Sequence, residues 1–400
     1  MLKKERILLI TLAAINFTNI MDFMIMMPLG PQLMRIFDIT PQQFGLVISA
    51  YTLSAGISGF CSAFFVDRFD RKSFLTFLYT GFLIGTLACG LAPTYALLLT
   101  ARILTGLFGG VLGALILSII GDVIPFERRG QAMGMIMAAF SVASVFGVPF
   151  GLFIANQFDW HAPFIFLAII GLPVMYFVLK YVPSITDHIH NKENRPNPVA
   201  ILQGITFDPN QRKAISLMMM LMFGHFSIIP FLSPFLVSNV GFEESQLAYV
   251  YAVGGVLTIF SSPLIGKWAD KFGKLKIFTI FVLLCTVPIF LLTNMPRVEI
   301  WMALIVTGAF FVFSGGRFIP AQAMVTSTVK PETRGSFMSI SSSLQQLSAG
   351  VASYIAGVIV VKQPSGELLN YNWVGYISIV ATVICLFLAR RIRTADGAKF

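Results

Sequence analysis

Charged residues are scarce in this chain. Asp, Glu, Lys and Arg make up 12% of its 400 residues, apolar types make up 56%, and the mean hydropathy is +0.81. A soluble domain carries about 25% charged residues, so roughly half of the usual polar coat is missing. The apolar residues come in runs of about 20, long enough to cross a bilayer as helices. The composition excludes a soluble globule and predicts an all-α membrane protein.

Residues suited to catalysis or metal binding are also few. We expect the four cysteines to be small core residues without disulfide or metal, since all lie in apolar runs without C-x-x-C spacing: Cys61, Cys89, Cys285 and Cys385. The four histidines are dispersed and form no cluster that an enzyme could use: His161, His188, His190 and His225. No P-loop is present, which argues against ATP-driven transport by this chain alone. We predict no enzyme activity, no cofactor and no metal.

Twelve apolar segments are long enough to be membrane spans. They cover about residues 7–29, 43–66, 73–93, 96–121, 131–155, 162–182, 214–238, 245–266, 275–294, 298–326, 336–361 and 372–389. The basic residues Lys3, Lys4 and Arg6 precede the first segment. That segment is too long for a signal peptide and no small-residue cleavage pattern follows it, so we expect an uncleaved first span.

Basic residues lie almost entirely in alternate loops. One set of loops holds 23 of the 28 Lys and Arg residues and the other holds three. This bias predicts that the basic loops and both termini are cytoplasmic, in the inner membrane of a bacterium. The net charge of +10 is then an orientation signal that meets anionic lipid rather than nucleic acid. A polar, proline-rich segment predicts a linker at 183–212 between two six-helix bundles, 1–182 and 213–400.

Two short loop patterns occur twice at almost the same spacing. Asp67-Arg68-Phe69-Asp70-Arg71-Lys72 returns as Asp270-Lys271-Phe272-Gly273-Lys274, 203 residues later. Glu127-Arg128-Arg129-Gly130 returns as Glu332-Thr333-Arg334-Gly335, 205 residues later. Two unrelated loops that repeat together indicate a duplicated half. A duplicated helical membrane protein is typical of transporters with a site at the interface of the halves.

These patterns resemble the major facilitator superfamily over the whole chain, and its drug:proton antiporter and sugar-efflux branch in particular. Three motifs carry the resemblance: the loop 67–72, Arg102-Ile103-Leu104-Thr105-Gly106, and Gly147-Val148-Pro149-Phe150-Gly151. The resemblance implies two pseudo-symmetric bundles of six helices. Two glycines of the family's loop are replaced by Ala63 and Asp70. Because aspartate tolerates positive φ, we expect the turn to survive at Asp70. The third motif has an extra residue between Gly147 and Pro149, which blurs the antiporter assignment.

The resemblance also implies a gating role for the loop. In the family, the loop aspartate caps the start of span eleven and the arginine meets an acid that ends span four. Here these are Asp67, Arg71 and Asp122, with Arg68 beside them and Asp270 in the second copy. Such contacts would hold the halves together on the cytoplasmic side. The alternative is that these charges only solvate and orient a loop.

Asp22 is the one carboxylate deep in a predicted span. Asp22 and Arg102 each lie seven residues from the outer end of their span, at about 10 Å depth. Their helices would both line the central cavity in the fold that the chain resembles. We expect an ion pair in which Asp22 binds the coupling proton and Arg102 sets its affinity. The alternative is a static pair that fastens span one to span four.

Other polar residues in the spans are candidates for a substrate cavity. They are Asn16, Asn19, Met26, His225, Arg317, Gln322, Gln345 and Gln346. Each has a plain packing alternative, since polar side chains also join membrane helices. Methionines on these helices favour a lipophilic, loosely specified substrate.

The sequence therefore predicts a proton-coupled efflux antiporter for small lipophilic or amphipathic compounds, acting as a monomer. Its partners would be the substrate, protons and membrane lipids, with no nucleic acid. One alternative is a sugar or metabolite efflux permease, and another is a proton-coupled uptake symporter. A receptor or scaffold would need no acid in the bilayer.

Overall fold

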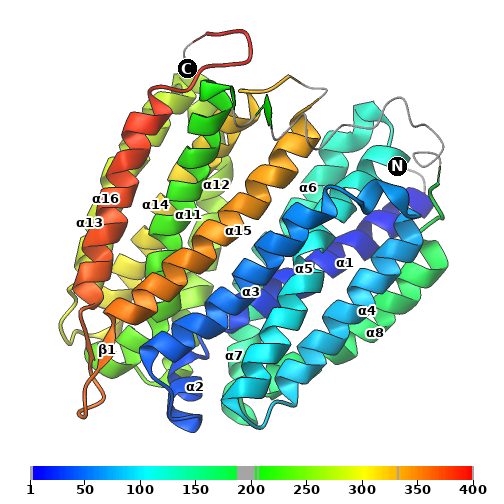
Figure 1. The fold of residues 1–400 in the computed structure, drawn as a ribbon. Coiled ribbons are helices and arrows are strands. Elements are labelled where there is room, and N and C mark those ends of the chain that lie inside the picture. The colour runs from blue at the N-terminus through cyan, green and yellow to red at the C-terminus, as the bar shows by residue number, and fades with distance from the viewer. Residues whose placement is uncertain (1–2, 187–202, 205–206, 331–332, 399–400) are drawn as a thin grey trace.

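The computed structural model describes residues 3–186, 203–204, 207–330 and 333–398, and these are almost entirely helical (Figure 1). The first half contains α1 (Lys3–Ile25), α2 (Gly30–Ile36), α3 (Pro41–Ser62), the 3₁₀ turn η1 (Val66–Arg68), α4 (Arg71–Gly90), α5 (Tyr95–Val123), α6 (Phe126–Val142), the π-helical turn η2 (Ala143–Gly147), α7 (Val148–Gln157) and α8 (Ala162–Tyr181).

The second half repeats this pattern after the linker. It contains α11 (Pro209–Phe235), η4 (Leu236–Val240), η5 (Glu244–Gln246), α12 (Leu247–Phe272), α13 (Lys274–Thr293), α14 (Ile300–Thr326), α15 (Arg334–Ile359), the short hairpin of β1 (Val361–Lys362) and β2 (Leu368–Leu369), and α16 (Tyr371–Ala389). The domain boundaries stay a prediction. Much of the predicted linker, and Glu332 of the second loop pattern, lie outside the described residues.

Twelve long helical segments correspond to the twelve predicted spans. Eleven are long and apolar enough to cross a membrane, among the residues that the structure describes. The twelfth, α15, has 26 residues but is rich in serine and carries Gln345 and Gln346. Helix α15 packs along α3 and α11, so these neighbours can provide hydrogen-bond partners for its polar side chains. The predicted all-α membrane fold is confirmed.

The first span is shorter than predicted. Helix α1 ends at Ile25, and turns at residues 26–29 lead into α2. Pro28 explains the break, because proline lacks an N–H and disfavours helical backbone in the residue before it. Another expectation was wrong in part: Cys89, Cys285 and Cys385 are buried, but Cys61 is exposed.

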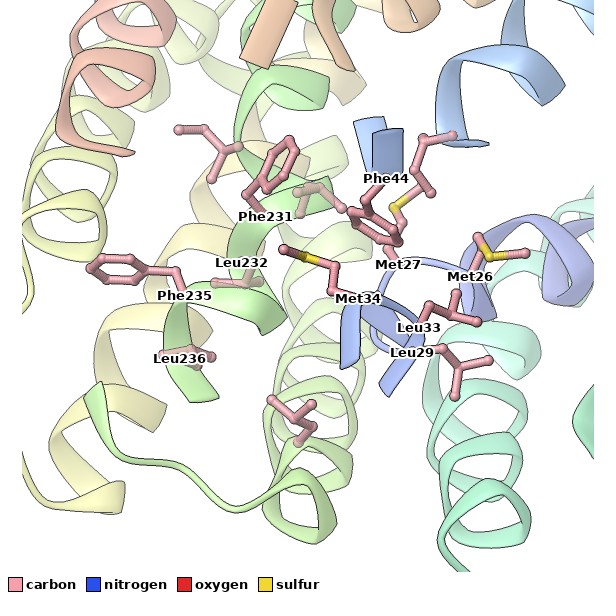
Figure 2. Packing of buried hydrophobic residues seen from close by; sticks show 14 of the residues in the cluster. Met26, Met27, Leu29, Leu33, Met34, Phe44, Phe231, Leu232, Phe235 and Leu236 are labelled. Atoms are coloured by element: carbon pink, nitrogen blue, oxygen red, sulfur yellow. The ribbon is translucent and has the colours of Figure 1, made fainter. Parts of the chain in front are cut away.

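The two halves share one hydrophobic core at only one end of the molecule. Both described termini lie at the other end, here called the basic end because the basic loops lie there (Figure 1). At the opposite, far end, residues from α1 to α3 pack against α11 in a single cluster (Figure 2). Phe44 meets Phe231 with ring centroids 5.9 Å apart. At the basic end the buried residues form separate clusters, one in the first half and two in the second, and Phe60 of α3 packs against one of the latter.

Small residues let the halves approach closely. A Cβ on Gly45 would lie 2.8 Å from the carbonyl oxygen of Ser353, where α3 crosses α15. The hydroxyl of Ser49 donates to the carbonyl oxygen of Gly350 at 2.8 Å. On the opposite side, a Cβ on Gly255 of α12 would meet Val145 of η2 at 2.7 Å. Two small-residue seams therefore connect the halves.

An ion pair also crosses the halves at the far end. Arg35 of α2 donates through both terminal nitrogens to the carboxylate of Glu244 in η5, and the Nη2–Oε2 bond is 3.2 Å. The Arg35 side chain is 65% exposed. An exposed pair contributes about 0.2–1 kcal/mol, so the apolar cluster dominates the closure of this end.

We expect Phe231→Ala to favour the state in which the far end is open. The substitution removes the ring that meets Phe44 across the halves, and the population should shift by about tenfold or more. Spin labels on cysteines at the exposed positions Ile36 and Tyr249, in a Cys61→Ser background, report the distance between the halves.

Phe82→Ala is the matched control, because Phe82 is equally buried but packs only within the first half. It should lower stability without lengthening the distance between labels. An unchanged distance distribution for Phe231→Ala would show that the cluster does not hold the far end closed.

Candidate functional site

A fully buried ion pair joins α1 to α5. Arg102 Nη1 lies 2.7 Å from Asp22 Oδ2, and both side chains are 0% exposed. The hydroxyl of Thr86 in α4 donates to Asp22 Oδ1 at 3.0 Å. The Arg102 guanidinium lies 4.4 Å from the ring centroid of Tyr51 in α3. Four helices of the first half therefore converge on one pair of opposite charges.

The pair is not fully satisfied. Arg102 Nε and Nη2 are buried and have no hydrogen-bond partner among the described residues. Removing two charges from water costs several kcal/mol per ion, about what the mutual attraction returns. The Tyr51 ring partly compensates the guanidinium through its negative face. A small change at Asp22, such as protonation, would therefore leave Arg102 poorly held.

The environment of the pair is set by a second hydrogen-bond chain. Tyr51 Oη donates to Asn19 Oδ1 at 2.8 Å, and Asn19 Nδ2 donates to the carbonyl oxygen of Gly109 at 3.2 Å. A Cβ on Gly109 would lie 2.8 Å from both Asn19 Oδ1 and Tyr51 Oη, so only glycine lets α5 approach. The sequence singled out Asn19 but missed Tyr51 and Thr86, because neutral polar residues in apolar spans carry no distinctive signal.

The third motif, residues 147–151, packs against α1. A Cβ on Gly151 would lie 2.7 Å from Ile25 Cδ1, and one on Gly147 would lie 3.1 Å from Met21 Sδ. Gly147 ends the π-helical turn and Pro149 follows in the first turn of α7. Proline cannot donate to the preceding turn, which favours a π-bulge just before it. The motif thus packs against residues of α1 that lie near Asp22 in the sequence.

Aromatic rings continue from the ion pair into the second half. Phe23 stacks on Tyr51 at 5.1 Å and meets Phe226 of α11 at 5.7 Å. Next to Phe226 is His225, whose ring centroid is 5.6 Å away. The predicted proton site at Asp22 and the predicted cavity residue His225 therefore lie near opposite ends of a row of rings that crosses between the halves.

The remaining cavity candidates are scattered. Asn16 Nδ2 donates to the carbonyl oxygen of Ile136 at 3.2 Å. Met26 is fully buried in the far-end cluster (Figure 2). Gln322 is exposed, Gln346 is half-buried, and the buried Gln345 donates to Ser341 Oγ at 3.2 Å. Arg317 is fully buried in α14.

The predicted gating loop forms a charge cluster at the basic end. Arg71 Nη2 lies 2.8 Å from Asp67 Oδ1, and Arg71 Nε lies 3.0 Å from Asp122 Oδ2. Arg68 and Asp270 are exposed. Among the described residues Asp67 pairs with Arg71 and forms no hydrogen bond to the start of α15, so its capping role there stays a prediction.

The expectation for Asp70 was wrong. Its φ is −57°, so it does not occupy a left-handed turn, whereas Gly273 in the second copy has φ +96°. Asp70 instead caps α4, accepting from the backbone N–H of Ser73 at 3.0 Å. It also accepts from Ser184 Oγ at 3.0 Å and from the N–H of Ile185 at 2.7 Å. The first loop is thus fastened to the start of the linker.

Hydrogen bonding determines the acidity of Asp70. Partial burial raises the pKa of its carboxyl, but the bonds from Ser73, Ile185 and Ser184 outweigh this and lower the pKa to about 2. The carboxylate therefore stabilises the fold fully above its ordinary pKa of 3.8, and this contribution is lost as the pH falls through about 2.

Comparison with known proteins identifies the family. The Major Facilitator Superfamily model matches residues 12–311 and 214–399. The chain belongs to the Major Facilitator Superfamily, a family of membrane transporters rather than enzymes. The family that the sequence resembles is thereby confirmed.

Curated relatives from bacteria include several transporters. The uncharacterized MFS-type transporter YceJ of Bacillus subtilis (strain 168) is 24% identical, covering 84% of this chain and 85% of that protein. Multidrug resistance protein 3 of the same organism is 30% identical over 49% of this chain and 42% of that protein. The probable sugar efflux transporter of Helicobacter acinonychis (strain Sheeba) is 22% identical, covering 98% and 96%.

Solved structures show the same fold. A bacterial homolog of the human lysosomal transporter Spinster, in an inward-facing and occupied conformation, has a TM-score of 0.76 at 16% identity, covering 97% of this chain and 96% of that chain. The D-xylose-proton symporter has a TM-score of 0.75 at 17% identity, covering 98% and 99%. At these identities the likeness concerns architecture.

We expect Arg102→Met alone to lower the free energy of unfolding by about 3–5 kcal/mol, since Asp22 is left buried and unpaired. The double variant Asp22→Leu with Arg102→Met should lose less than the single variant. Unfolding in mixed micelles by SDS titration measures both. Arg35→Met, at an exposed arginine, is the control and should cost about 1 kcal/mol or less. A double variant that loses as much stability as Arg102→Met alone, or more, would contradict the coupling.

A second expectation concerns Asp70. Asp70→Gly should release the linker start, so that the amide of Ile185 exchanges hydrogen faster. It should cost only about a few tenths of a kcal/mol through the α4 cap, because glycine is itself tolerated at an N-cap. Asp70→Asn is the matched control, because it keeps a capping oxygen. In the wild type, the protection of the Ile185 amide against hydrogen exchange should be the same at pH 5 and pH 7, after correction for the intrinsic exchange rate. Both pH values lie above the pKa range of Asp70, so its carboxyl stays charged. Unchanged exchange in Asp70→Gly would refute the attachment.

Proposed function

We propose that this transporter is a proton-coupled antiporter that exports small lipophilic or amphipathic compounds by alternating access. The observation that carries the proposal is the buried pair of Asp22 and Arg102. An acid in the middle of a membrane protein is costly and is retained mainly where it moves protons or ions. A sealed pair with two unpartnered nitrogens on Arg102 is poised to respond to a proton.

The orientation follows from the loop charges. Under the positive-inside rule the basic end is cytoplasmic, and both termini lie there in a bacterial inner membrane. The shared cluster at the far end then closes the outer side, while the separate clusters at the basic end correspond to a state that faces the cytoplasm. An exporter loads its substrate in this state.

The coupling step runs through α1 and α3. Protonation of Asp22 removes its charge and weakens its bond to Arg102. The guanidinium then depends on the face of Tyr51, whose hydroxyl already holds Asn19. Because Tyr51 lies on α3, and α3 forms the seam with α15, a shift of α3 would be transmitted to the second half. The proton thereby biases the equilibrium between the two facing states.

The charge cluster of Asp67, Arg71 and Asp122 would act at the cytoplasmic end. It ties η1, the turn after α3, to α4 and α5 within the first half. In this role it stiffens the first bundle, so that the bundle moves as one body. Asp67 would contact the start of α15 only when the cytoplasmic side closes.

A polar substrate is the second candidate. The names of the Helicobacter relative and of the xylose–proton symporter point to sugars. The half-buried amide of Gln346 could bind a hydroxyl group. However, the amide nitrogens of Asn16 and Asn19 already donate to backbone carbonyls, and the central rings are apolar. These features favour an amphipathic substrate, carried by a monomer whose basic loops meet anionic lipid.

The test uses reconstituted vesicles with an internal pH dye. A panel of anionic, neutral and cationic amphipathic compounds is added under an imposed pH gradient, and wild type should dissipate the gradient with some of them. Asp22→Asn should reduce this proton flux by about tenfold or more, because it cannot exchange a proton. Asp38→Asn, the same change in a far-end loop, should leave it unchanged. Undiminished proton-driven transport by Asp22→Asn would refute the proposal.

A further inference from the structure

A second buried charge lies in the other half without a counter-charge. Arg317 of α14 is 0% exposed. Its Nη1 donates to Thr382 Oγ1 of α16 at 2.5 Å, and its Nη2 donates to Ser314 Oγ at 3.5 Å. Its Nε is buried and has no partner in the described part of the chain. A guanidinium has five N–H donors in a planar fork, so most of this one is unused.

Among the residues that the structure describes, no acidic group forms an ion pair with Arg317. The described acidic residues of the second half lie in loops or at helix ends, and none forms an ion pair with Arg317: Asp208, Glu243, Glu244, Asp270, Glu299, Glu367 and Asp396. Two hydroxyls alone do not neutralise a cation in an apolar interior. Such a residue at membrane depth is expected to be functional.

His225 lies on α11, which packs against α14, the helix that carries Arg317. One of the rings that contact its imidazole is Phe318, the residue that follows Arg317. The His225 Nδ1 atom is buried and unpartnered among the described residues. Rings surround the imidazole: Phe310 stacks at 5.7 Å with an interplanar angle of 7°, and Phe318 meets it edge-on at 5.7 Å. The unpartnered nitrogen of His225 thus lies within an aromatic enclosure that includes Phe318, the residue next to Arg317.

We propose that Arg317 and His225 bind the anionic group of an aromatic carboxylate substrate. The planar fork of Arg317 matches a carboxylate, and Nδ1 of His225 supplies a further polar contact. The aromatic body of the substrate would pack against Phe310, Phe318 and Phe226. This inference rests on the proposed function and names its substrate class.

The position of the site suits entry from the basic end. Arg317 lies nine residues before Thr326, the basic end of α14, which corresponds to about 14 Å. His225 and Phe318 are half-buried rather than sealed. Above them, the row formed by Phe226, Phe23 and Tyr51 separates this region from the far-end cluster. An anion would therefore reach Arg317 from the end at which the two halves have separate cores.

Cinnamate and its neutral amide, cinnamamide, test the inference on purified full-length protein in nanodiscs. The two probes share the same aromatic body, and differ in carrying a charged carboxylate or a neutral carboxamide. Calorimetry should show that wild type binds cinnamate about tenfold or more tightly than cinnamamide, since a charge-assisted bond replaces a neutral one. Arg317→Gln should remove this preference. Arg297→Gln, at an exposed arginine in a far-end loop, should keep it.

Two further variants guard against misfolding. Arg317→Lys keeps the charge but loses the fork, and should retain part of the preference. His225→Phe preserves the ring packing and should weaken the binding of cinnamate severalfold. Equal binding of the two probes by wild type, or an unchanged preference in Arg317→Gln, would overturn the inference. This binding is measured without a pH gradient. Undiminished proton-driven transport by Asp22→Asn would therefore refute the proposed function without changing the result of this binding test.

Discussion

The fold of the first half depends on one constraint: two opposite charges, Asp22 and Arg102, sit where water does not reach. Every helix around them contributes something that the pair needs. Thr86 donates to the acid, the Tyr51 ring covers the base, and Gly109 lets α5 come close enough. The pair is therefore a hub of packing as well as a candidate proton site, and a change in its charge cannot remain local.

Duplication gave the halves one architecture, but their chemistry has diverged. The first half holds a neutral pair, while the second holds an isolated cation, Arg317, nearer to the basic end. The loops differ in the same way. Arg71 of the first copy bridges Asp67 and Asp122, whereas Asp270 of the second is exposed and Ser327 stands where Asp122 would. Such asymmetry fits a transporter in which one half handles the proton and the other the substrate.

Periodicity and charge predicted what depends on the bilayer, and failed where single contacts decide. The spans follow from helix rise and the length of the apolar runs. The expected pairing of Asp22 with Arg102 is observed, although α1 ends at Ile25, four residues before the predicted end of its span. The break in α1 was missed because apolarity continues through Pro28. Asp70 was misread because its partner Ile185 is 115 residues away. No local pattern reveals such a contact.

Helix α3 connects the charge pair to the motion of the halves. One of its faces presents Tyr51 to Arg102, and another presents Gly45 and Ser49 to α15. The α15 side of this seam is polar, yet its hydroxyls bond within their own helix or to a neighbouring backbone. A seam of small residues has few interlocking side chains, so it can slide or rock at low cost. The least apolar of the long helices, α15, thus lies at the seam where the halves must move. A shift of α3 on protonation of Asp22 would act directly on this seam.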